Sequence, residues 1–62
     1  MYRLEVYSAG KLDHVEVCAR AGDVLDAIPR LLKEHAGCER IVVMVGATAL
    51  FSVDCQGNTR PG

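Results

Sequence analysis

The chain has 62 residues, half of them apolar, with seven basic and eight acidic side chains. This composition argues against a disordered tail and against a dedicated nucleic-acid binder, which needs excess positive charge for the phosphates. No stretch has the length and apolarity of a membrane span, and the charged N-terminal segment lacks the apolar run of a signal peptide. Three cysteines without a CxxC pair fit a reducing cytoplasm, where we expect the protein to reside.

The first predicted elements form a hairpin, because residues 2–7 and 12–19 alternate between apolar and polar side chains as strands do. A two-residue turn at Ala9-Gly10 would join them. In an unbroken ladder from this turn, Leu4 lies opposite Val15 on an apolar face. The other face is then charged, and we expect it to be solvated rather than catalytic. Its side chains would be those of Arg3, Glu5, His14, Glu16 and Cys18.

An amphipathic helix is predicted next, since apolar residues recur at helical spacing through residues 24–32. Asp23 is the expected N-cap, and Gly37 suits the C′ position. Pro29 removes one backbone hydrogen bond and leaves two interpretations open. We favour a loose first turn followed by regular helix, and the alternative is a longer helix kinked at Pro29.

A second hairpin is predicted from residues 39–45 and 48–54, with a type II′ turn at Gly46-Ala47. An unbroken ladder sets Val43 opposite Leu50 on one face. The opposite face is also apolar, and one helix can cover only one of the two. We therefore expect an interface at the second face, formed by Val42, Met44, Phe51 and Val53.

These elements define an α+β domain over residues 1–55 with the order β-β-α-β-β, followed by a flexible C-terminal tail at residues 56–62. The helix joins the second strand to the third, so a right-handed crossover would make those strands parallel within one sheet. The expected architecture is a four-stranded mixed sheet with one helix packed on one face.

The second ladder also suggests one site of possible chemistry. Extended past the strands, it sets Cys38 beside Cys55, with His35 one helical turn before Cys38 and His14 nearby. Thiols and imidazoles are ligands of zinc sites and participants in redox sites. A metal- or redox-responsive module is therefore an alternative function. The spacing lacks the close ligand pairs typical of zinc sites, so we expect no metal and no cofactor.

The segments YRLEVY and DAIPRLLKEHAGCERIVVMVGATALF, with the Gly turn after the first, resemble a group of short bacterial proteins of unknown function. Those proteins have a strand pair, a helix and a second strand pair. The resemblance covers about residues 2–53 and implies the same order of elements, although Met44 stands where the group usually has an aromatic residue. The group has no established activity, so the resemblance implies no site.

The sequence therefore favours a non-enzymatic domain that acts by protein association, as a homodimer or as an accessory module of a larger assembly. A domain below about 70–80 residues rarely gains more than about 3–5 kcal/mol from its core and often needs a partner. No phosphate-binding loop or metalloprotease motif indicates a reaction. A ligand binder with a site between subunits is a further alternative.

Overall fold

The computed structural model describes residues 1–61, and Gly62, the last residue of the predicted tail, lies outside them. These residues form one helix and five strands, which confirms the α+β class. In chain order the elements are β1 (Tyr2–Ser8), β2 (Lys11–Cys18), α1 (Ala21–Glu34), β3 (Arg40–Val45), β4 (Thr48–Asp54) and β5 (Thr59–Pro61).

The strands form a single sheet in the order β2-β1-β3-β4-β5, and every neighbouring pair is antiparallel. The prediction of a four-stranded mixed sheet is therefore wrong in two respects. The strands β2 and β3 run in the same direction, as the crossover requires, but β1 lies between them. Residues 59–61, which the sequence places in the tail, form β5 and pair with β4.

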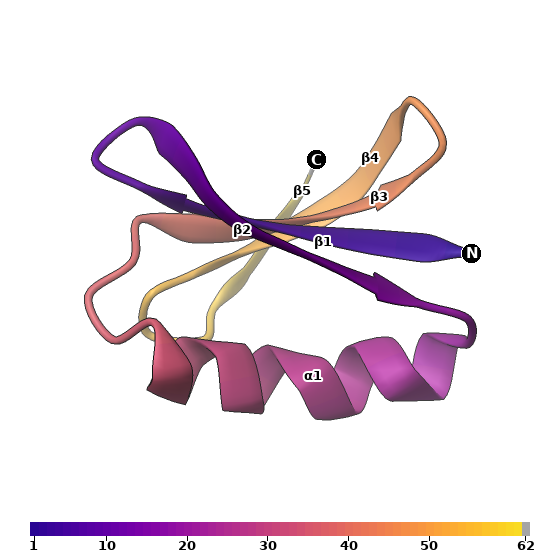
Figure 1. Ribbon diagram of the computed structural model, residues 1–62, viewed down its shortest axis with the longest axis horizontal. Coiled ribbons are helices and arrows are strands. Elements are labelled where there is room, and N and C mark those ends of the chain that lie inside the picture. The colour runs from indigo at the N-terminus through magenta and orange to yellow at the C-terminus, as the bar shows by residue number, and fades with distance from the viewer. Residues whose placement is uncertain (62) are drawn as a thin grey trace.

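The fold has two layers, and Figure 1 shows α1 lying along one face of the twisted sheet. The core lies between these layers. Its buried side chains come from the centre of the sheet and from one side of the helix: Leu4, Val6, Cys18, Val24, Ala27, Leu31, Cys38, Ile41 and Val43. Among residues 1–61, no element covers the opposite face, which we call the outer face.

The β1–β2 and β3–β4 hairpins each have a two-residue turn followed by a β-bulge. The first turn has positive φ at Ala9 (54°) and Gly10 (77°), as a type I′ turn requires, and Gly46 has φ 58°, as the first position of a type II′ turn requires. The predicted pairing holds for the first two pairs after each turn. It then shifts by one residue, because Asp13 in β2 and Leu50 in β4 are extra residues without a direct partner.

The helix α1 is continuous from Ala21 to Glu34 and includes Pro29. It begins two residues before the expected N-cap Asp23, and Arg20 at the N-cap position makes no side-chain capping bond within the described chain. His35 is the C-cap residue, and Gly37 follows with φ 84°. In the described part of the chain, no helix combines the length and the apolarity needed to cross a membrane.

Candidate functional site

The bulge at Asp13 reverses the expected faces of β2. After it, Glu16 pairs with Leu4, so the side chain of Glu16 lies on the same face as the buried core. Val15 and Val17 lie on the outer face, where 40% and 57% of their surface is exposed. The expectation that the valines face the core is therefore wrong, and so is the expectation that Cys18 is solvated, since only 7% of it is exposed.

The inward-facing polar side chains of β2 find partners at the helix. Glu16 accepts a hydrogen bond from Arg30, which also donates to Glu34 through Nη1 at 3.2 Å. The ring of His14 stacks on that of His35, with 5.1 Å between ring centroids. These contacts explain how a strand can turn its polar side toward α1 without leaving its charges unpaired.

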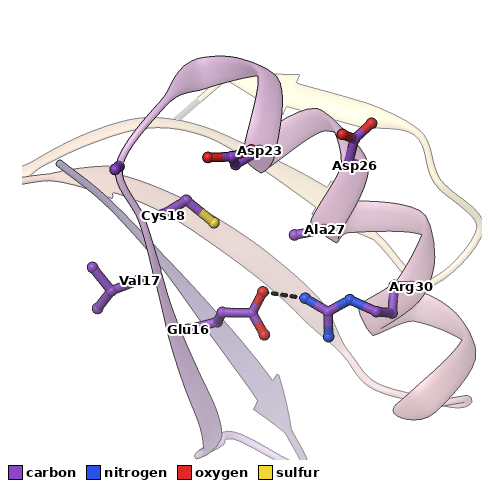
Figure 2. Close-up of a pocket in the computed structure, with 8 residues that line it drawn as sticks. Glu16, Val17, Cys18, Asp23, Asp26, Ala27 and Arg30 are labelled. Atoms are coloured by element: carbon purple, nitrogen blue, oxygen red, sulfur yellow. Dashed lines mark hydrogen bonds and ion pairs between the residues drawn. The ribbon is translucent and has the colours of Figure 1, made fainter.

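A hollow of about 310 Å³ lies beside this contact, between β2 and α1. Figure 2 shows Cys18, Asp23 and Asp26 around it, with the Glu16–Arg30 pair at one end. Burial, followed by the charges of Glu16 and Asp23, raises the pKa of Cys18. An activated thiol needs a lowered pKa, so the environment of Cys18 disfavours nucleophilic chemistry in this hollow.

The bulge at Leu50 changes the composition of the expected interface. Phe51 pairs with Val43 and packs against the core, and Val53 pairs with Ile41 and is 2% exposed. These two side chains therefore lie on the helix-facing side, because directly paired residues share a face. Of the four residues expected at the interface, only Val42 and Met44 lie on the outer face. They pair with Glu5 and Arg3 of β1, whose side chains lie on that face.

The outer face carries five apolar side chains larger than alanine, which we call the outer-face patch: Leu12, Val15, Val17, Val42 and Met44. The first three were missed by the sequence interpretation. The sequence does contain an indication of the bulge. Leu12 and Val15 are three residues apart and so break the two-residue alternation of a regular strand.

A polar stripe on β1 divides the outer-face patch into two bands. Glu5 lies between Val15 and Val42, and both of its carboxylate oxygens are occupied. Arg3 Nε donates to one at 3.0 Å, and the Tyr7 hydroxyl donates to the other at 3.0 Å. The hydrogen bond to Glu5, followed by burial, raises the pKa of Tyr7. Both oxygens of Glu5 thus have donors within the stripe itself.

The expected cysteine and histidine site is only partly assembled. Cys38 is 3% exposed, Cys55 is exposed, and all three cysteines are free. His35 Nδ1 lies 3.2 Å from an oxygen of Asp13 and so points toward β2. Within residues 1–61, no three His, Cys, Asp or Glu side chains are grouped so that they could hold a metal ion.

No protein-family model, curated protein or solved structure matches this chain. The resemblance to short bacterial proteins therefore stays a prediction. The role of the chain follows from its own geometry, in which the outer face and the thiols of Cys38 and Cys55 are the features that the fold itself does not explain.

Proposed function

We propose that this chain acts by associating with a second copy of itself through the outer face of the sheet. The observation that carries the proposal is the orientation of β2. Val15 and Val17 point away from the helix, while the polar His14 and Glu16 point toward it. A solvated face would favour the opposite arrangement, because apolar surface is stabilised when it leaves water. The outer-face patch therefore has the composition of a surface that becomes covered.

The polar stripe on β1 is compatible with such a cover. Burial of an unpaired carboxylate is costly, but both oxygens of Glu5 already accept hydrogen bonds from neighbours on the same strand. Arg40 also lies over the ring of Tyr7, with its guanidinium carbon 4.6 Å from the ring centroid. A partner can therefore cover Glu5 without having to supply donors for its carboxylate.

Both sheet edges favour association through the face over addition of a strand. The edge strand β2 has Lys11, the bulge at Asp13 and the inward-pointing Glu16, which are features that disfavour pairing with another chain. The other edge, β5, has only three residues and includes Pro61, which lacks a backbone donor. Two sheets packed face to face are the remaining route, with their side chains meeting at about 10 Å separation.

The size of the molecule is sufficient for this arrangement. A standard interface takes about 800 Å² from each partner. The accessible surface of the described residues is 3952 Å². A symmetric dimer through the outer face would therefore cover about a fifth of each subunit. The face also carries Arg3, Arg40 and Arg60 against Glu5 and Asp54, so two copies meet with an excess of only one positive charge on each.

The proposal is tested by Val17→Lys, which places a charge in the outer-face patch at a side chain that is already 57% exposed. We expect the unaltered chain to sediment as a dimer at micromolar concentration. The variant should sediment as a folded monomer, because an unpaired lysine would have to lose its water in the interface. Sedimentation velocity gives the mass, and circular dichroism checks the fold.

Leu25→Lys is the matched control, since Leu25 is 66% exposed on α1, on the other side of the sheet. This variant should remain dimeric. A monomeric unaltered chain at every concentration, or a Val17→Lys variant that dimerises as well as the control, would remove the proposal.

A further inference from the structure

Two thiols from different segments lie at the same end of the β3–β4 hairpin. The ladder between these strands ends with the pair Arg40 and Asp54. Cys55 follows this pair directly on one side, and Cys38 lies two residues before it on the other. Continued by one step, this ladder sets Glu39 opposite Cys55, so Cys38 is the immediate chain neighbour of the residue that faces Cys55. The charge of Cys55 also contributes to raising the pKa of Cys38.

The backbone on both sides of this pair is fixed by hydrogen bonds. The N–H of Cys38 donates to the carbonyl of His35 at 2.9 Å. Cys55 lies in the turn between β4 and β5, which Asp54 closes by accepting the N–H groups of Gln56 and Asn58, each at 2.9 Å. Neither cysteine therefore depends on a loose terminus for its position.

The two thiols differ in access to solvent. Cys55 is exposed, whereas Cys38 is 3% exposed and belongs to the core. An external reagent can therefore reach Cys55 first, whereas Cys38 is shielded from it. This is the arrangement of an attacking thiol and a resolving thiol.

We propose that Cys55 and Cys38 form an intramolecular disulfide by exchange with a low-molecular-weight disulfide such as oxidised glutathione. The Cys55 thiolate attacks one sulfur of the reagent, the reagent's S–S bond breaks, and one glutathione thiolate leaves. Cys38 then loses its proton to solvent and attacks Cys55 Sγ. The mixed disulfide breaks, the Cys38–Cys55 bond forms, and the second glutathione thiolate leaves. The protein loses two electrons and two protons, and the reagent becomes two thiols.

The environment of Cys38 affects how readily its thiolate forms for the second step. Burial, followed by the charge of Cys55, raises the pKa of Cys38. Once Cys55 is in the mixed disulfide it carries no charge, so the second of these two contributions disappears and the Cys38 thiolate forms more readily. Because the thiolate is the nucleophile, the second step should accelerate about tenfold per pH unit below the thiol pKa.

The test is incubation of the full chain with oxidised glutathione, followed by alkylation of free thiols and mass spectrometry. We expect the unaltered chain to lose two hydrogens and to keep one alkylated thiol, Cys18. Cys38→Ala should instead keep one glutathionyl group on Cys55. Cys18→Ser is the control and should form the disulfide like the unaltered chain. Peptide mapping of the unaltered product identifies the linked pair without relying on any variant.

The proposal would be overturned by a glutathionyl group that stays on Cys55 in the unaltered chain as it does in Cys38→Ala. A disulfide between two chains would overturn it equally. The outcome does not depend on dimerisation through the outer face, because Val17→Lys should form the intramolecular disulfide to the same extent. If neither the unaltered chain nor Val17→Lys forms the disulfide, the disulfide proposal is contradicted and the dimer proposal is not. The sedimentation experiment tests the dimer separately.

Discussion

Single side chains attach the edge strand β2 to the helix. Glu16 bonds to Arg30, and His35 at the end of α1 contacts both Asp13 and the ring of His14. These groups are partly exposed, so each contact contributes little free energy by itself. Their effect is to orient α1 on the sheet and to keep the valines of β2 on the outer face.

Asp54 fixes the turn that brings β5 alongside β4. The hydrogen bond from the backbone of Asn58, followed by that from Gln56, lowers the pKa of Asp54 from its ordinary value of 3.8. The folded state therefore binds a proton less readily than the unfolded chain. The stabilisation is complete above the unfolded pKa and is lost as the pH falls through the lower folded pKa.

We expect acidification to release β5 before the core unfolds. The cross-strand NOE between Val53 and Thr59 should be present at neutral pH and should disappear as Asp54 becomes protonated. Asp54→Ala should lack this NOE at neutral pH, because the turn has lost its acceptor. Asp26→Ala is the control, since Asp26 is exposed on α1. Persistence of the NOE in Asp54→Ala would contradict this role.

Among the elements, the β1–β2 and β3–β4 hairpins share one arrangement, of which the sequence predicted the turn and the first two residue pairs but not the bulge. Each has a two-residue turn, two regular pairs and a bulge at the third residue of its second strand, which is Asp13 in β2 and Leu50 in β4. The turns were predictable, because glycine with positive φ is a local requirement. The bulges were not, because the phase of a strand beyond its turn is decided by packing against distant residues such as α1.

The position of β1 was missed for a related reason. A crossover helix fixes the relative direction of the strands it joins but does not require them to be neighbours. Leu4 and Val6 are completely buried, and a central strand buries them better than an edge strand would. The short β5 has no alternating pattern to predict it and depends on the turn at Asp54. Thus the helix and the first four strands could be predicted from local sequence. The order of the strands in the sheet, and which side of each strand faces the helix, could not.

The helix offers a test at the level of one element, because Pro29 lies in its interior on the exposed side. Pro29→Ala restores a backbone donor toward Leu25 and removes no buried side chain. We expect the free energy of unfolding to increase by about 1–3 kcal/mol. Urea denaturation measures it. An unchanged or lower stability would indicate that Pro29 contributes packing that its exposure does not suggest.

For the whole molecule, stability and association should be linked. The completely buried side chains are few, with Leu4, Leu31, Ile41, Val6 and Val43 the largest of them. A core of this size gives the single chain a small free energy of unfolding. A partner that binds only the folded chain increases that free energy by mass action.

We therefore expect the Tm of the unaltered chain to rise with protein concentration, by several degrees for each hundredfold increase, while the Tm of Val17→Lys stays constant. Differential scanning fluorimetry over a concentration series, with reducing agent present, measures both. A Tm that is independent of concentration in the unaltered chain would contradict the linkage.

The bulge at Asp13 has a consequence for how this chain tolerates changes in length. Deletion of this one residue would restore an unbroken alternation and rotate the rest of β2 by half a turn about its axis. Val15 and Val17 would then pack beneath α1, and Glu16 would point into water. A one-codon deletion next to a surface turn, usually a mild event, would here exchange the inside and the outside of a whole strand.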